Sequence, residues 1–245
     1  MNIFKIGSPF FNFMSRLADI VILGIVAAVC CIPVVTVGAS MSALYYVLLK
    51  LARHEEIDRG ILPTYFKAFG QNFWKATGLW LIMAVVIALL FVDYNLLYNL
   101  DLNNESISWT TLIIMTVILT FIGNYIMPLQ AQFENPIRRT LKNSFILSVM
   151  NLPRSLALLA VQLSPLLVWI FYPELLFVLL FCNITIIPYL KAEIFVKVFA
   201  KYMPEKPTEP VEEREIYVGT PVSAPFAPMP TLEELEQEEL KAEEE

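Results

Sequence analysis

Apolar residues occur in long runs along the first 203 residues, and charged or turn-forming residues separate these runs. A helix needs about 20 mostly apolar residues to cross roughly 30 Å of hydrocarbon. Four runs reach or approach that length: Ala76–Val92, Ile107–Met127, Ser155–Tyr172 and Leu175–Leu190. The pattern therefore predicts an all-α, polytopic membrane protein.

The N-terminal apolar run extends from Leu17 to Leu49 with Asp19 as its only charge. As one helix it would measure about 50 Å, which is too long for one span and short for two. Pro33 removes a backbone donor and Gly38 permits a turn, so we predict a tight helical hairpin in the middle of the run. The two helices of this hairpin are expected at about Phe10–Cys31 and Val34–Arg53.

The positions of basic residues indicate how the spans are oriented. All fourteen Lys and Arg residues before Met203 fall in segments on one side of the membrane if the chain has six spans. Because cytoplasmic connectors carry an excess of Lys and Arg, six spans place both termini in the cytoplasm. A five-span alternative, in which Ala39–Arg53 is re-entrant or interfacial, places Lys5 and Arg16 outside and breaks the rule.

Composition divides the chain into two parts. Hydrophobic residues make up 57% of the chain and charged residues 16%, whereas charged residues reach about a quarter of soluble proteins. Residues 1–203 carry 14 basic and 10 acidic side chains, and residues 204–245 carry 3 and 13 together with seven prolines. We predict a transmembrane helical domain over 1–203 and a disordered, Pro-rich and acidic cytoplasmic tail over 204–245.

Two segments of the chain, which include Tyr46–Leu79 and Tyr125–Leu158, align without a gap at a spacing of 79 residues. The identical pairs are Tyr46 with Tyr125, Ala52 with Ala131, Glu55 with Glu134, Arg59 with Arg138, Phe66 with Phe145, Asn72 with Asn151 and Leu79 with Leu158. Each segment has a span entering the cytoplasm, a basic amphipathic connector and a span leaving it. A parallel internal repeat, as found in transporters, is one interpretation. Chance alignment of two inner connectors of similar composition is the other.

Four residues at the ends of spans have predicted structural roles. Arg16 and Asp19 lie three residues apart on the first helix, so we expect an interfacial ion pair between them. Asn72 and Asn151 are expected at bends from the connectors into the next spans, where a side-chain amide caps the start of a helix. A polar binding contact is the alternative role for both asparagines.

Neutral polar residues at membrane depth are the candidates for function. Asn124, Gln162 and Asn183 lie in the middle or inner part of predicted spans, where each needs a hydrogen-bond partner. Contacts between helices are the simpler role for these residues, and lining a solute path is the alternative. Lys191, near the end of the last span, is expected to snorkel to the interface.

Other classes of function receive no support from the residues. The chain has one histidine, no Gly-rich phosphate loop and no zinc-ligand spacing. We therefore predict a non-enzymatic protein without a catalytic, cofactor or metal site. Nucleic-acid binding is not expected, because the basic residues follow the membrane edges and form no patch with stacking aromatics.

The segments FNFMSRLADIVILGIVAAVCCIPVVTVGASMSALYYVLLKL and YFKAFGQNFWKATGLWLI resemble the YesL-like family of bacterial integral membrane proteins. The resemblance covers roughly residues 1–200 and is most specific at the Arg16–Asp19 pair, the turn CIPVVTVGAS, Tyr45–Tyr46 and the connector from Phe66 to Lys75. The family has no established activity and supplies no functional residues. The acidic tail is not part of the resemblance.

Members of this family are often encoded near carbohydrate ABC-transport components and sensor kinases. The resemblance therefore implies a protein of the bacterial plasma membrane that acts as an accessory to carbohydrate ABC uptake or its sensing. The partners it implies, besides the lipid bilayer, are a carbohydrate ABC permease or a sensor kinase. A small-solute transporter or channel built on the repeat is the alternative.

Overall fold

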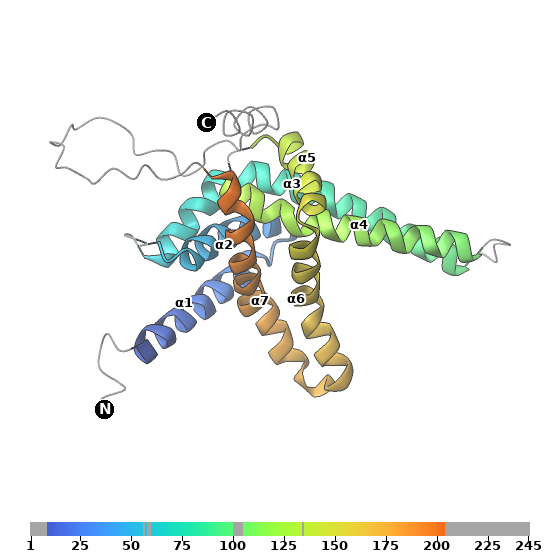
Figure 1. Ribbon diagram of the computed structural model, residues 1–245. Helices are drawn as coiled ribbons and strands as arrows, with labels where there is room; N and C mark the ends of the chain where they lie inside the picture. The colour runs from blue at the N-terminus through green and yellow to red at the C-terminus, as the bar shows by residue number, and fades with distance from the viewer. Residues whose placement is uncertain (1–8, 56, 58–59, 100–104, 134, 204–245) are drawn as a thin grey trace, which may run out of the picture.

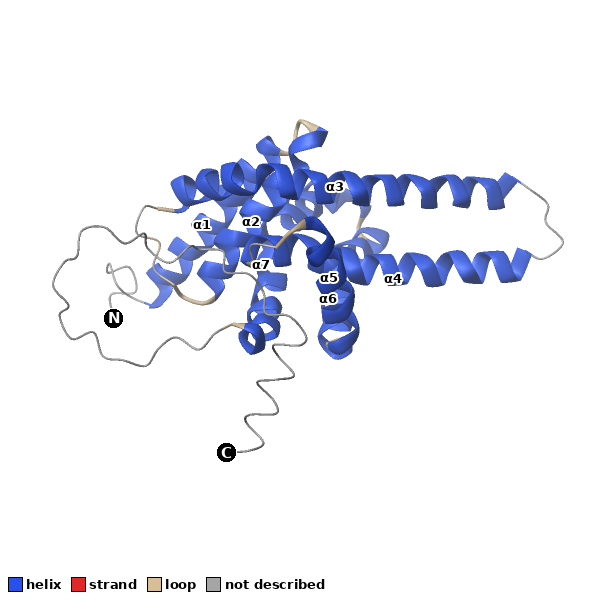
Figure 2. Ribbon diagram, turned by 90° about the horizontal axis from the view of Figure 1, so that it is seen from above, coloured by secondary structure: helices blue, strands red, loops and turns tan. Residues whose placement is uncertain are grey.

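The computed structural model describes residues 9–55, 57, 60–99, 105–133 and 135–203 (Figure 1). Its α-helices are α1 (Pro9–Cys30), α2 (Val37–Ala52), α3 (Ile61–Asn99), α4 (Glu105–Gln132), α5 (Ile137–Met150), α6 (Leu152–Phe171) and α7 (Leu176–Phe199). Short 3-10 turns cover η1 (Val34–Thr36), η2 (Pro173–Leu175) and η3 (Ala200–Tyr202). Figure 2 shows no strand in this part of the chain, which confirms the all-α fold there. The predicted tail, 204–245, lies outside the described residues.

Five helical segments of the described residues are long and apolar enough to cross a membrane. They are Val34–Ala52, Ile61–Asn99, Ser108–Gln132, Leu152–Phe171 and Val178–Tyr202. These segments support the predicted class, a polytopic helical membrane protein. Val34–Ala52 is among them, and it overlaps Ala39–Arg53, which the five-span alternative counts as re-entrant or interfacial. The first predicted span corresponds to α1, a helix of 22 residues that is not among the five.

The turn between α1 and α2 forms at Pro33, as predicted. The hydroxyl of Thr36 donates to the carbonyl oxygens of Cys30 at 2.6 Å and of Pro33 at 2.7 Å, and these bonds close the turn. Gly38, predicted to be a turn residue, lies inside α2 instead. A Cβ atom on Gly38 would be 2.3 Å from the carbonyl oxygen of Ala76. The prediction for Gly38 is wrong, because this glycine serves a close approach of α2 and α3.

The central helix of the fold is α2. Eleven of its 16 residues are buried, and it packs against α1, α3, α4 and α7. Phe195 of α7 is fully buried and contacts Tyr45 of α2 and Tyr125 of α4, with ring centroids 6.2 and 5.2 Å apart. It also stacks on Phe199 at 5.4 Å. Aromatic rings therefore join three helices in one core.

The segments that correspond in the 79-residue alignment differ at the connector. α3 is continuous, whereas the second segment is divided into α5 and α6 at Asn151. Pro153 of the second segment aligns with Trp74 of the first. Proline lacks a backbone N–H and disfavours helical conformation in the preceding residue, so a break is expected only in the second segment. The bend predicted at Asn72 is wrong, and the bend at Asn151 is confirmed.

Neither Asn72 nor Asn151 makes the predicted capping bond. Asn72 is buried in α3, and its Nδ2 donates to the carbonyl oxygen of Gln130 on α4 at 3.5 Å. Asn151 precedes α6, but its Oδ1 accepts from Arg154 at 3.3 Å and its Nδ2 donates to the carbonyl oxygen of Leu147 at 3.3 Å. These alternative partners satisfy both amides, and the capping predictions are wrong.

The predicted ion pair between Arg16 and Asp19 is also wrong. Arg16 donates to Nδ1 of His54 at 2.8 Å. The fold brings the residues that follow α2 next to α1 and so provides this acceptor. An ion pair does join Arg53 and Glu55, in the residues that follow α2.

Two helical hairpins, α3–α4 and α6–α7, leave the core in different directions (Figure 1). α3 has 39 residues and measures about 58 Å, so it extends well beyond its contact with α2. Near the far end of the α3–α4 hairpin, Tyr94 packs against Trp109 at 5.6 Å and Tyr98 at 6.4 Å. Such aromatic clusters are typical of membrane interfaces.

Candidate functional site

Lys191 is the only charged side chain that is buried within the described part of the chain, with 5% of its surface exposed. It lies on α7, eight residues before the last residue of the helix, Phe199. Side chains on an α-helix tilt toward the N-terminus of the helix. The end of α7 nearer to Lys191 is the C-terminus, so the side chain tilts away from that end. The side chain therefore extends toward the middle of the helix, and the prediction that Lys191 snorkels to the interface is wrong.

Two of the three candidate polar residues surround this ammonium group. Lys191 Nζ donates to Oδ1 of Asn124 on α4 at 2.7 Å and to Oε1 of Gln162 on α6. Asn124 in turn donates through Nδ2 to the carbonyl oxygen of Thr120 at 3.0 Å. Residues from three helices thus form one group, which we call the Lys191 cluster: Lys191, Asn124 and Gln162. Asn124 and Gln162 thus each contact another helix through Lys191.

The Lys191 cluster contains a positive charge without a negative partner. No carboxylate among the described residues forms an ion pair with Lys191. Amide oxygens are dipoles and compensate the charge only in part. Placing an ionised lysine inside a membrane costs about 3 kcal/mol on insertion scales, and such residues are rare outside functional positions. The cluster is therefore the strongest candidate site of the described chain.

A cleft of about 280 Å³ lies beside the cluster, between α6 and α7. Its lining is mostly apolar, and the two polar residues on it are Gln162 and Asn183. Asn183, the third predicted candidate, is half-buried and makes no hydrogen bond within the described residues. The structure therefore brings all three candidates into one region, since Gln162 belongs to both the cluster and the cleft.

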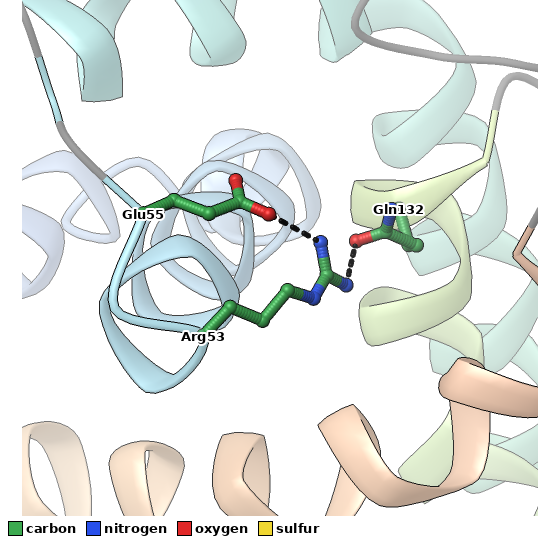
Figure 3. Close-up of polar contacts among 3 residues, drawn as sticks. All are labelled: Arg53, Glu55 and Gln132. Atoms are coloured by element: carbon green, nitrogen blue, oxygen red, sulfur yellow. Dashed lines mark hydrogen bonds and ion pairs between the residues drawn. The ribbon is translucent and has the colours of Figure 1, made fainter. Parts of the chain in front are cut away.

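A second polar group joins the ends of α2 and α4 (Figure 3). Arg53 lies 3.6 Å from Oε1 of Glu55 and donates to Oε1 of Gln132 at 2.5 Å. Burial lowers the pKa of Arg53, and the nearby charge of Glu55 acts in the opposite direction. Because arginine stays protonated in proteins, Arg53 donates a charge-assisted hydrogen bond to the neutral amide of Gln132, and this bond links the ends of the two helices.

A third polar group lies in the interior between α3, α4 and α5. Gln130 accepts a hydrogen bond from the hydroxyl of Thr140 at 3.0 Å, and its Nε2 lies 3.4 Å from Oδ1 of Asn72. All three side chains are buried, and their polar atoms satisfy one another. This arrangement fits a structural role, because mutual hydrogen bonds are what buried amides require.

The described residues form an all-helical fold with five segments long and apolar enough to cross a membrane, and the Lys191 cluster joins three of these segments. Residues 16–94 match the family described as "Protein of unknown function, DUF624". The match includes α2, most of α1 and most of α3, and it ends before the residues of the Lys191 cluster. No curated protein and no solved structure matches the chain.

Proposed function

We propose that this protein crosses the bacterial plasma membrane six times, with both termini in the cytoplasm. Five apolar helical segments together with α1 support six spans. The one-sided distribution of Lys and Arg supports the orientation. The bacterial membrane follows from the YesL-like resemblance, and the DUF624 match lies within the same segment.

Cysteine labelling tests this topology. In a variant without the three native cysteines, we expect a membrane-impermeant maleimide added to intact cells to label Tyr98→Cys and to leave Lys67→Cys unlabelled. Both positions are exposed in the structure, so a difference in labelling reports sidedness. Labelling of Lys67→Cys in intact cells would contradict the orientation, and permeabilised cells provide the positive control.

We infer that the protein is a non-enzymatic accessory to carbohydrate ABC uptake or its sensing. The observation that carries this proposal is the sparse packing of its spans. Only 17% of the residues in the most apolar stretch of α3, and the same share in α6, are buried within the chain. Apolar helices that do not pack internally leave surface for the spans of another membrane protein. The cleft between α6 and α7 is mostly apolar, whereas a path for a polar solute needs a polar lining.

Affinity capture from native membranes tests the accessory role. We expect a carbohydrate permease subunit or a sensor kinase to co-purify in stoichiometric yield. Bulky substitutions at exposed positions, Leu89→Trp on α3 and Leu167→Trp on α6, identify which hairpin makes the contact, because at least one should abolish co-purification. A protein that purifies alone and moves solutes in liposomes would overturn the proposal.

A small-solute transporter built on an internal repeat is the second candidate function. The Lys191 cluster favours it, because ionisable residues within spans often mark substrate paths. The contact between Arg53 and Gln132 also supports a repeat, since these residues are 79 positions apart and correspond in the two aligned segments. Solute flux into proteoliposomes that is lost on Lys191→Met distinguishes this candidate from the accessory role.

A further inference from the structure

We propose that the cleft between α6 and α7 binds a small organic anion, a carboxylate on an apolar body, whose charge is compensated by Lys191. The site would exist whether the protein acts as an accessory or as a transporter. Four observations support it: the orientation of Gln162, the unpaired amide of Asn183, the uncompensated charge of Lys191, and the size and lining of the cleft.

The hydrogen bond from Lys191 determines which way the amide of Gln162 faces. An ammonium group only donates hydrogen bonds, so the amide atom next to it must be the oxygen, Oε1. The amide nitrogen, Nε2, then remains as a donor without a partner among the described residues. Because Gln162 lines the cleft, this donor is available to a ligand there.

Asn183 supplies a second unused amide on the wall of the cleft. It has no hydrogen-bond partner within the described residues, although an amide at membrane depth needs one. Lys191 does not line the cleft, but its ammonium group binds Gln162, which does, so its positive charge lies beside the cleft. The region therefore combines unused donors with a positive charge, which selects for an acceptor that carries a negative charge.

The dimensions and lining of the cleft restrict the rest of the ligand. Its volume of about 280 Å³ lies near the lower end of known ligand pockets, which begin at roughly 300 Å³. Leucine side chains, Pro165 and Trp169 form most of the wall. A sugar or a phosphate ester would place several polar groups against this wall without partners, which is unfavourable. A carboxylate on a short hydrocarbon or aromatic body fits both the wall and the donors.

Such a carboxylate can come from water or from the bilayer, and the choice of probes separates the two sources. Benzoate represents a water-borne carboxylate and octanoate a fatty acid that also partitions into lipid. Octanamide has the same chain as octanoate without the charge and is the matched control. The full-length protein in lipid nanodiscs is titrated with each probe, and binding is measured by calorimetry and by the shift of the unfolding temperature.

We expect saturable binding of octanoate and no comparable binding of octanamide. Lys191→Met should weaken octanoate binding by about tenfold or more, because the charge that compensates the ligand is removed. Lys197→Met, which removes an exposed lysine from the same helix, should leave binding unchanged. Binding of benzoate as well supports a water-borne ligand, whereas binding of octanoate alone supports one that reaches the cleft from the bilayer.

Asn183→Leu keeps the test decisive if Lys191→Met does not fold. Asn183 has no partner to lose, so the variant should fold and bind octanoate several-fold more weakly. Leu180→Met, another wall position, is the control for altered packing and should bind as the native protein does. The proposal is overturned if neither carboxylate binds, if octanamide binds as tightly as octanoate, or if Asn183→Leu leaves the affinity unchanged.

Discussion

Replacing Gly38 by alanine is expected to destabilise the protein by about 3 kcal/mol, the upper end of the usual cost of overpacking. The added Cβ would lie 2.3 Å from the carbonyl oxygen of Ala76 and 2.6 Å from Cβ of Trp80. Neither atom is the end of a flexible side chain, so relief requires α3 to move away from α2. Because α2 is the centre of the fold, this movement would disturb the whole core. The measurement is the midpoint of thermal unfolding of the purified protein, followed by loss of the monodisperse peak after heating.

Gly70→Ala is the matched control for this prediction. Gly70 is also helical, and a Cβ atom added to it meets nothing within 4 Å. Alanine is favoured over glycine inside a helix by about 0.5–1 kcal/mol, so this variant should be as stable as the native protein or more stable. Equal losses in both variants would show that the α2–α3 approach is not the reason for a glycine at position 38.

The N-terminal hairpin could be predicted from sequence, its first helix almost to the residue, whereas the second helix begins at Val37 rather than Val34, after η1. The predicted first helix, about Phe10–Cys31, corresponds to Pro9–Cys30 in the structure. The run of apolar residues was too long for one span, and Pro33 marked the interruption. The role of Gly38 could not be predicted, because a glycine in a turn and a glycine at a helix contact look the same in sequence. Only the position of α3 distinguishes them.

The connectors show which local signals carry information about helix ends. Pro153 could have predicted that the second segment bends and the first, with Trp74 at the aligned position, does not. The similarity of Asn72 and Asn151 suggested the opposite, a bend in both. A side-chain amide has many alternative partners in a folded chain, so its presence alone is weak support for a cap.

Two members of the Lys191 cluster, Asn124 and Gln162, could be predicted as candidates, but Lys191 and the assembly of the cluster could not. Asn124, Gln162 and Asn183 are conspicuous in sequence because polar residues are rare in apolar runs. The short distance from Lys191 to the helix end predicts a place at the interface. The tilt of helical side chains toward the N-terminus is the sequence-level signal that places the ammonium group deeper along α7 instead. Asn124 and Gln162 meet at Lys191 because of the way α4 and α6 pack. Hydropathy carries no information about this packing.

Hydropathy also cannot separate helix faces that pack in the core from faces that meet lipid. Lipid tails are as apolar as leucine, so both kinds of face have the same composition. In this chain α2 is mostly buried, whereas α3 and α6 are mostly exposed, although all three are apolar. The loss of stability when a side chain is removed therefore distinguishes a face that packs in the core from a face that meets lipid.

Phe195→Ala is expected to destabilise the protein by about 3 kcal/mol, the lower end of the usual range for buried phenylalanines. Phe195 is fully buried and contacts the rings of Tyr45, Tyr125 and Phe199. In a membrane protein, transfer of the side chain from lipid to the core contributes little, so the loss comes from the cavity and from the missing ring contacts. Unfolding in a denaturing detergent titration measures it.

Phe181→Ala on the same helix removes an equal number of atoms from an exposed position. Phe181 is 42% exposed, and its ring makes no aromatic contact within the described residues. The removed ring is replaced by lipid rather than by a cavity, so the change should stay within about 0.5 kcal/mol of the native protein. A difference of about 2 kcal/mol or more between the two variants is expected. Similar losses in both would mean that the rings around Phe195 do not hold α2, α4 and α7 together.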